Sequence, residues 1–117
     1  MDEAKFLCDS NQLVEGQYVE LQIDMDRGPM FMVGTRHRGE PRVWMNSCPH
    51  QGRPLNWAPN QFLKDDQGQL VCAAHGAVFE PDAGLCVSGP CRNASLTPVE
   101  VRELDGRIQL EPCAPEG

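Results

Sequence analysis

Two short cysteine–histidine signatures constrain the fold of this chain more than any other feature. The first is Cys48-Pro-His50 and the second is Cys72-Ala-Ala-His75, so each supplies one thiolate and one imidazole. Residues 51 to 71 separate the two signatures, and this stretch is long enough for a pair of strands that brings two loops side by side. We therefore expect two neighbouring loops that share one metal centre.

The division of these ligands by type indicates a binuclear iron–sulfur cluster with two cysteines on one iron and two histidines on the other. Thiolates stabilise ferric iron and bridge well to a sulfide core, whereas neutral imidazoles remove negative charge from the second iron and raise its potential. Gly52 and Gly76 follow the signatures and would let backbone amides approach the sulfides. A single zinc site is an alternative, although zinc fingers usually pair like ligands with one another.

Composition limits the classes of function. The chain has 117 residues, 40% of them hydrophobic, which suits one small domain over residues 1–117. Its net charge of −7, with no block of lysine or arginine, argues against nucleic acid or a membrane surface as partner and favours a protein with a basic docking face. The first residues lack a signal-peptide pattern, and no apolar run approaches about 18 residues. We therefore expect a soluble cytoplasmic protein in which six cysteines indicate metal binding rather than a secreted disulfide framework.

The hydrophobic pattern is that of an all-β protein. Apolar and polar residues alternate over 19–23, which predicts a half-buried strand. The continuous apolar run 29–33 predicts a strand buried on both sides, and 42–45 predicts its neighbour after a turn. Near the C-terminus, Asp105-Gly106 predicts a tight hairpin turn between two further strands.

The segment from about residue 46 to residue 92 holds both signatures and differs from its surroundings. Phe62-Leu63 and Leu70-Val71 predict short strands within it, separated by turn residues. The sequence contains no stretch of three or more helical turns with amphipathic spacing. We expect an antiparallel β sandwich or barrel with an inserted cluster-binding subdomain at about 46–92.

The signatures and their surroundings resemble the Rieske family, and specifically its small Rieske-type ferredoxins. The resemblance rests on Cys48-Pro-His50-Gln-Gly, Cys72-Ala-Ala-His75-Gly-Ala-Val-Phe, Asp82-Ala-Gly84 and Ser88-Gly-Pro90, the last being similar to the family's proline loop. Together with the strand pattern it covers nearly the whole chain. It implies one Rieske-type [2Fe-2S] cluster and a Rieske-like fold.

By this resemblance, Cys48 and Cys72 bind the inner iron, and His50 and His75 bind the outer iron through Nδ1. The other ring nitrogens of the two histidines would lie near solvent and give electrons a short exit.

Departures from the high-potential members of the family predict a low midpoint potential. Those members carry a disulfide between the ligand loops, where Arg53 and Ala74 stand here, and they place a serine and a tyrosine hydroxyl where Ala77 and Phe79 stand here. Without these donors the reduced cluster loses charge-assisted hydrogen bonds. We expect a potential near the bottom of the Rieske range of about −150 to +300 mV.

These features predict a one-electron carrier between a flavin reductase and an oxygenase or another reductase, without an enzymatic reaction of its own. One alternative is a tightly bound electron-transfer subunit of a larger oxidoreductase, similar to the small subunits of nitrite reductase or arsenite oxidase. Another is a redox sensor that uses Cys86 and Cys91, although two packing thiols beside the proline-loop match are favoured for this pair.

The remaining aromatic, histidine and cysteine residues are expected to serve structure. Trp44 and Trp57 are predicted to pack, although Trp57 could also shield the cluster. His37, between two arginines, is expected at a strand end on the surface. Cys8 and Cys113 lie in no motif and are expected to be structural.

Overall fold

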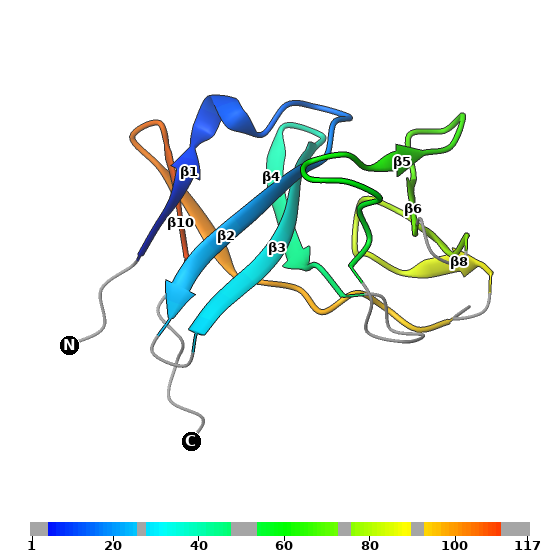
Figure 1. The fold of residues 1–117 in the computed structure, drawn as a ribbon. Coiled ribbons are helices and arrows are strands. Elements are labelled where there is room, and N and C mark those ends of the chain that lie inside the picture. The colour runs from blue at the N-terminus through cyan, green and yellow to red at the C-terminus, as the bar shows by residue number, and fades with distance from the viewer. Residues whose placement is uncertain (1–4, 26–27, 48–53, 73–75, 90–92, 111–117) are drawn as a thin grey trace, which may run out of the picture.

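The computed structural model describes residues 5–25, 28–47, 54–72, 76–89 and 93–110 (Figure 1). Within these ranges the named strands pair antiparallel, and the helical element is a single 3-10 turn, η1 (Ser10–Gln12). The predicted all-β antiparallel architecture is confirmed. No helix in the described ranges has the length and apolar character needed to cross a membrane.

Three consecutive strands form the central sheet, in the order β2 (Val19–Met25), β3 (Gly28–His37) and β4 (Glu40–Met45). β3 and β4 are joined by a turn in which Arg38 and Gly39 have φ angles of 54° and 80°. Two successive positive φ angles match the twist of the flanking strands, which is why a tight hairpin forms at this point. The strands predicted from residues 19–23 and 42–45 are confirmed.

A second sheet has the order β1 (Lys5–Asp9), β10 (Arg107–Leu110), β9 (Val101–Leu104). β9 and β10 form the predicted hairpin, with positive φ angles of 54° and 78° at Asp105 and Gly106. β1 was not expected from the sequence. We call the strands β1–β4, β9 and β10 together the main body.

The four remaining strands form the inserted sheet, which lies between β4 and β9 in the sequence and at one end of the molecule (Figure 1). Its order is β5 (Leu63–Lys64), β6 (Leu70–Val71), β7 (Val78–Phe79) and β8 (Cys86–Ser88). The short strands expected at 62–63 and 70–71 are present, the first shifted by one residue. β7 and β8 were not predicted.

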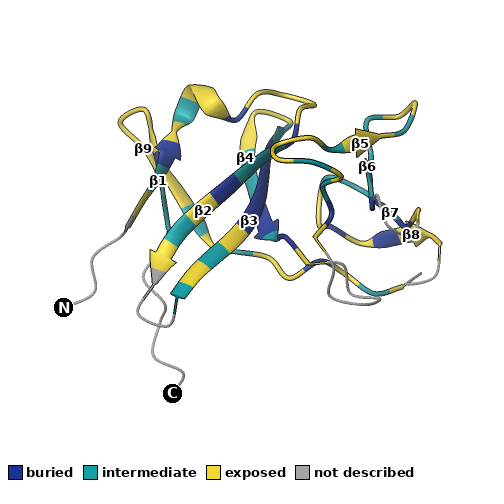
Figure 2. Cartoon of the chain, viewed as in Figure 1, coloured by how far each residue is buried: buried dark blue, intermediate teal, exposed yellow. Residues whose placement is uncertain are grey.

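Two groups of buried side chains hold these sheets together (Figure 2). The body core lies within the main body, and the shared core joins the main body to the inserted sheet. β3 passes between them, because consecutive side chains of a strand point to opposite faces: Met32 belongs to the body core and Val33 to the shared core. The body core consists of Cys8, Leu13, Leu21, Met32, Val43 and Ile108. The shared core consists of Tyr18, Val33, Trp44, Leu55, Leu70, Cys72, Ala77, Phe79, Cys86 and Leu96.

The prediction of two-sided burial over residues 29–33 is wrong for the first half of that run. Pro29 is exposed and the side chain of Phe31 is 45% exposed, whereas residues 32–35 are buried. The reason is that one face of the first half of β3 packs against the body core through Met30, whereas the other face, which carries Pro29 and Phe31, meets solvent. An apolar run alone does not reveal which of its faces will be covered.

Some of the expectations for single residues are confirmed and others are wrong. Trp44 is 3% exposed and packs in the shared core as predicted, but Trp57 is 60% exposed and is not a packing residue. His37 ends β3 as predicted, although it is half-buried. Cys8 is buried in the body core, and desolvation, reinforced by the nearby Asp9 charge, raises the pKa of its thiol to about 11. Cys113 lies outside the described residues.

Candidate metal centre

Cys72 directly follows β6, and its side chain is completely buried in the shared core. The backbone folds back on itself here: the N–H of Cys72 donates to the carbonyl of Ala77 over 2.7 Å, and the N–H of Gly76 donates to the carbonyl of Cys72 over 2.8 Å. Gly76 has a φ of +76°, a conformation that glycine adopts without steric cost. The turn that carries the second signature is therefore closed at its base.

A buried thiol in apolar surroundings fits a metal-bound thiolate. Leu55, Ala77 and Phe79 belong to the same buried cluster as Cys72. A thiolate in such surroundings is unfavourable unless a cation compensates its charge, and soft sulfur donors suit iron–sulfur clusters. The described donor is thus chemically suited to the iron–sulfur centre that the two signatures predict.

The described residues on either side of the first signature are held together by a side chain. Oδ1 of Asn46 accepts a hydrogen bond from the N–H of Leu55 over 2.8 Å. Leu55 is itself completely buried in the shared core that contains Cys72. Asn46 and Leu55, on the two sides of the first signature, therefore meet next to the core in which Cys72 lies.

The chain after β8 lies against the same turn. A Cβ atom placed on Gly89 would lie 2.7 Å from Cα of Ala77, so the two backbones pack directly on each other. The base of the following segment is closed by two hydrogen bonds, from the N–H of Cys86 to the carbonyl of Ala94 and from the N–H of Asn93 to the carbonyl of Cys86. The chain at Gly89 thus packs on the turn at Ala77, and Cys86 at the start of β8 is bonded to Asn93 and Ala94.

One of the four predicted ligands, Cys72, lies in the described part of the structure. Cys48, His50 and His75 lie outside the described residues, as does Pro90 of the proline-loop match. Within the described ranges no group of three or more histidine, cysteine or acidic residues could hold a metal ion. The complete ligand set therefore remains a prediction.

A comparison with family models decides the identity of the domain. The model described as Rieske [2Fe-2S] domain matches residues 3–111. This chain belongs to the Rieske [2Fe-2S] domain family. The predictions of the family and of its [2Fe-2S] cofactor are confirmed, in preference to the single zinc site. A search of curated proteins found no match to this Rieske chain.

Solved structures share the fold at low sequence identity. The terminal oxygenase of carbazole 1,9a-dioxygenase from Novosphingobium sp. KA1 matches with a TM-score of 0.77 and 20% identity, over 98% of this chain and 31% of that chain. The Sphingomonas yanoikuyae B1 ferredoxin matches with a TM-score of 0.72 and 20% identity, over 95% and 100%. The ferredoxin of carbazole 1,9a-dioxygenase from Nocardioides aromaticivorans IC177 matches with a TM-score of 0.69 and 18% identity, over 94% and 98%. The Rieske chain thus spans only 31% of the length of the terminal oxygenase chains from Novosphingobium sp. KA1 and Nocardioides aromaticivorans IC177.

Two positions that the resemblance links to the midpoint potential of the cluster hold apolar, buried side chains in this Rieske chain. Ala77 is 0% exposed and Phe79 is 1% exposed, and both belong to the shared core beside Cys72. Neither side chain carries a hydroxyl, so neither can donate a hydrogen bond. Arg53 and Ala74, the positions that replace the disulfide, lie outside the described residues.

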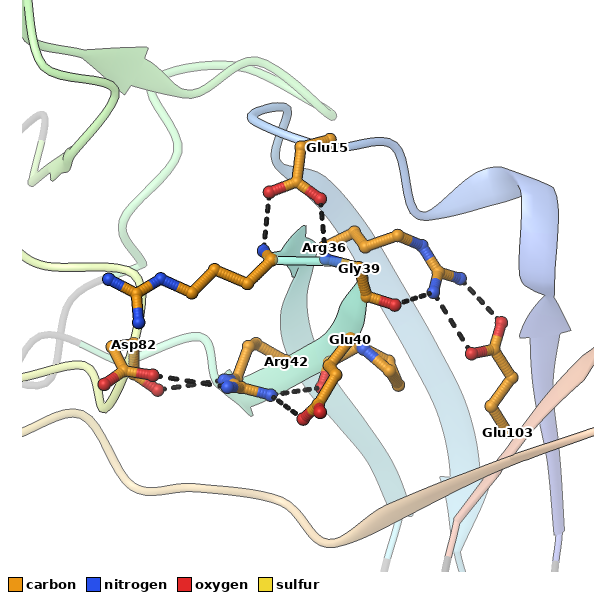
Figure 3. Close-up of polar contacts among 9 residues, drawn as sticks. Glu15, Arg36, Gly39, Glu40, Arg42, Asp82 and Glu103 are labelled. Carbon is orange, nitrogen blue, oxygen red and sulfur yellow. Dashed lines mark hydrogen bonds and ion pairs between the residues drawn. The ribbon is translucent and has the colours of Figure 1, made fainter.

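An ion pair between Arg42 and Asp82 fixes the turn between β7 and β8 to the main body (Figure 3). The Arg42 guanidinium donates from Nε to the carbonyl of Asp82 over 3.0 Å and from Nη2 to its Oδ1 over 3.2 Å. Oε1 of Glu80 accepts from the N–H groups of Ala83 and Gly84, which shapes the same turn. This turn packs against Trp44, because a Cβ on Gly84 would lie 2.6 Å from the indole Nε1.

The sequence analysis did not identify two polar residues that the structure places in or next to the shared core that contains Cys72. The hydroxyl of Tyr18 donates to the carbonyl of Gly68 over 3.0 Å and so ties β2 to the inserted sheet. Burial raises the pKa of Tyr18 to about 12, which keeps the hydroxyl protonated as a donor. Asn46 is the second, and its position directly before Ser47-Cys48 is the signal that could have indicated it.

Cys86 was predicted either to pack or to pair with Cys91. It is 1% exposed in the shared core, and its Sγ donates to the carbonyl of Ser88 over 3.2 Å. This burial agrees with the packing interpretation. Cys91 lies outside the described residues, so a bond between the two thiols stays a prediction.

Proposed function

We propose that this chain is a one-electron carrier that accepts an electron from a flavin-containing reductase and delivers it to an oxygenase or another redox enzyme. In this proposal Cys48 and Cys72 bind the inner iron of the cluster, and His50 and His75 bind the outer iron. The [2Fe-2S] cluster supplies one-electron chemistry when bound, and the protein supplies positioning and a docking surface. The observation that carries the assignment is the completely buried Cys72 at a closed turn of a Rieske domain.

The fold comparison and the net charge support the proposal. The fold resembles two ferredoxins over nearly their whole length, and solved complexes join oxygenase and ferredoxin in carbazole 1,9a-dioxygenase, which makes an oxygenase a reasonable acceptor here. The net charge of −7 favours a partner with a basic face.

We take residues 1–117 as one domain with a cluster-binding subdomain at about 46–92, and we expect it to act in the reducing cytoplasm.

The potential is proposed to be low. Ala77 and Phe79 present no hydroxyl beside Cys72, so the reduced cluster lacks two donors that would stabilise its extra negative charge. A clearly negative midpoint in a redox titration is expected, and a value above roughly +100 mV would contradict this part of the proposal.

The ligand assignment is tested by matched pairs of variants. His50→Ala and His75→Ala are expected to lose the Rieske electron paramagnetic resonance signal, whereas His37→Ala, at the end of β3, is expected to keep it. In the same way Cys72→Ala is expected to lose the cluster and Cys8→Ala, equally buried but in the body core, to retain it. A cluster that survives in any one of the three ligand variants would contradict the assignment.

Electron delivery is tested with an acceptor in hand. The reduced protein is mixed with the terminal oxygenase of carbazole 1,9a-dioxygenase, and reoxidation of the cluster is followed by its absorbance. We expect reoxidation to slow as the salt concentration rises, because screening weakens the attraction between an acidic carrier and a basic docking face. An acceptor-independent rate would remove the support for an oxygenase partner.

A permanently bound electron-transfer subunit is the second candidate, and the outer face of the inserted sheet favours it. Val71 pairs with Leu63 on one side and with Val78 on the other, so the three residues form one row across the sheet. Leu63 is 43% exposed and the two valines are half-buried, which leaves an apolar row in reach of a partner. Co-purification of a second chain at native expression levels would favour this candidate, and elution alone would favour the carrier.

A further inference from the structure

Two buried polar side chains stand out among the described residues, and they differ in what they hold. Thr35 is 1% exposed and its Oγ1 donates to the carbonyl of Gln17 over 2.6 Å, within the main body. Asn46 is 8% exposed and directly follows β4, two residues before Cys48. A buried amide is retained where its hydrogen bonds are satisfied, so the partners of Asn46 show what it does.

The side chain of Asn46 forms the centre of a directed row of hydrogen bonds. Its Oδ1 accepts from the N–H of Leu55 over 2.8 Å, and its Nδ2 donates to Oδ1 of Asn56 over 2.8 Å. Nδ2 of Asn56 in turn donates to the carbonyl of Ala58 over 3.0 Å. Because a backbone N–H can only donate, Leu55 fixes the orientation of the first amide, and that amide fixes the second.

The backbone of Asn46 is anchored on the opposite side. Its N–H donates to the carbonyl of Phe31 over 3.0 Å, which extends the ladder between β3 and β4 by one residue. The preceding N–H, that of Met45, donates to the carbonyl of Thr97 over 2.8 Å. Asn46 therefore joins the main body to the chain at Leu55, and residues 47–54 start and finish at its two ends.

We propose that Asn46 is a positioning residue for the metal centre. Its carboxamide closes the base of the segment that carries Cys48 and His50 and holds that base against Leu55, which shares its buried cluster with Cys72. Groups that orient metal ligands without binding the metal set the geometry and electronic properties of the site. This inference rests on the ligand assignment proposed above.

The test compares Asn46→Ala with Thr35→Val, because each removes one buried polar side chain and its hydrogen bonds. Asn46→Ala is expected to shift the g values of the reduced cluster and to speed cluster loss to an iron chelator by about tenfold or more, the size typical when a ligand-orienting group is removed. Thr35→Val is expected to lower the melting temperature while the g values and the rate of cluster loss stay at wild-type values. Asn46→Asp keeps the acceptor for Leu55 but loses the donor to Asn56, so it is expected to shift the g values by less than Asn46→Ala does.

One further variant and the signal of the wild-type protein keep the outcomes distinct. If Asn46→Ala yields no folded protein, Asn56→Ala decides. It removes the hydrogen bonds of Asn56 to Asn46 and Ala58 but keeps the one from Leu55 to Asn46, and it is expected to shift the g values in the same direction by less. Unchanged g values and chelator rates in Asn46→Ala, or in Asn56→Ala when it decides, would overturn the inference. So would equal changes in Thr35→Val. A wild-type protein without a Rieske signal would instead defeat the proposed function, so the two failures are separable.

Discussion

The main body and the inserted sheet are stabilised by different means. In the main body, β3 is 10 residues long and pairs along most of its length with β2 and β4. In the inserted sheet, β5, β6 and β7 have 2 residues each and β8 has 3. Each paired residue contributes to the ladder, so the inserted sheet gains far less from backbone pairing than the main body does.

Polar contacts increase this contrast. All five N–H donors of Arg36 are used. Nη1 donates to Gly39 and Glu103, and Nη2 donates to Glu103 (Figure 3). Nε donates to the carbonyl of Leu13, and Nη2 also donates to that of Ser10. One side chain thus ties β3 to the end of β1, to the turn before β4 and to β9. These segments of the main body are therefore joined by protein hydrogen bonds alone.

The inserted sheet depends on what it shares with its neighbours. Its buried residues lie in the shared core with Trp44 and Val33 of the main body, and its turns are closed around Cys72 and Cys86. A cluster bound there would link segments that few backbone hydrogen bonds connect. The comparison therefore predicts that changes to the cofactor affect one region and changes to Arg36 affect the other.

Removal of the cluster should have the largest effect, and that effect should be local. Amide exchange at Cys72 and Cys86, whose N–H groups close the two turns, is expected to accelerate by about 100-fold or more in the cluster-free protein. Exchange at Met45 and Val99, which donate to Thr97 and Val43, is expected to change by less than about threefold. Hydrogen exchange followed by mass spectrometry measures both, and uniform acceleration would show that the two regions are one unit.

Arg36→Ala should have the reverse effect. The variant leaves the carbonyls of Ser10 and Leu13 and the carboxylate of Glu103 without their donor, so we expect the free energy of unfolding to fall by about 2–4 kcal/mol. Chemical denaturation of the cluster-loaded protein measures this loss. The g values of the cluster are expected to stay at wild-type values.

Arg107→Ala is the matched control for Arg36→Ala. Arg107 is an exposed arginine on β10, so its removal changes the net charge equally and is expected to change stability by less than about 0.5 kcal/mol. If both variants lose the same stability, the loss comes from charge and not from the five hydrogen bonds. A shift of the g values in Arg36→Ala would show that the regions are coupled.

Hydroxyl groups added beside Cys72 should raise the midpoint potential. Phe79→Tyr and Ala77→Ser each introduce a donor next to the site, and one net hydrogen bond to the reduced cluster corresponds to a rise of about 20–60 mV for a one-electron couple. Potentiometric titration followed by electron paramagnetic resonance measures the shift. The stability of the main body is not expected to change.

Val78→Thr provides the control for these hydroxyls. Val78 lies between Ala77 and Phe79 in the sequence but in the row with Leu63 and Val71 on the opposite face of the inserted sheet. Its hydroxyl is therefore expected to leave the potential unchanged. Equal shifts in Val78→Thr and Phe79→Tyr would contradict the assigned faces, and no shift in Ala77→Ser and Phe79→Tyr would contradict the proposed positions of the donors.

The parts of the fold that could be predicted are those with strong local signals. The hairpin turn at Asp105-Gly106 carries its own backbone preference, and the alternation over residues 19–23 follows the period of a strand. β7 and β8 have only 2 and 3 residues, too few to show a period. Whether Phe31 or Trp57 is covered depends on distant segments, so their exposure of 45% and 60% had no local signal.

In the candidate site too, the residue with a local sequence signal was predicted and the residues that depend on distant contacts were not. Cys72 was predicted because the spacing to its histidine is a local pattern with a chemical meaning. Tyr18 was not, because its partner Gly68 lies 50 residues away in the sequence. Asn46 was not, because nothing in its neighbours shows that its amide will meet the N–H of Leu55. Residues that orient a site through tertiary contacts leave little trace in the sequence.

The smallest predicted effect concerns the acid stability of the main body. Hydrogen bonds from Arg36 lower the pKa of Glu103 below its ordinary value of 4.5. A lowered folded-state pKa means that the ionised carboxylate stabilises the fold: its contribution is present above pH 4.5 and is lost as the pH falls through the folded-state pKa. We expect wild type to exceed Glu103→Gln by about 0.5–1 kcal/mol near pH 6 and the difference to vanish towards pH 3.

Denaturation of both proteins at several pH values measures that difference, in which effects of acid on the cluster itself cancel. Glu100→Gln, an exposed carboxylate just before β9, changes the net charge equally and serves as the control. A difference between wild type and Glu103→Gln that stays constant with pH would mean that Arg36 is held by the backbone carbonyls of Leu13, Ser10 and Gly39 alone. The contribution of Arg36 to the stability of the main body would then be independent of pH.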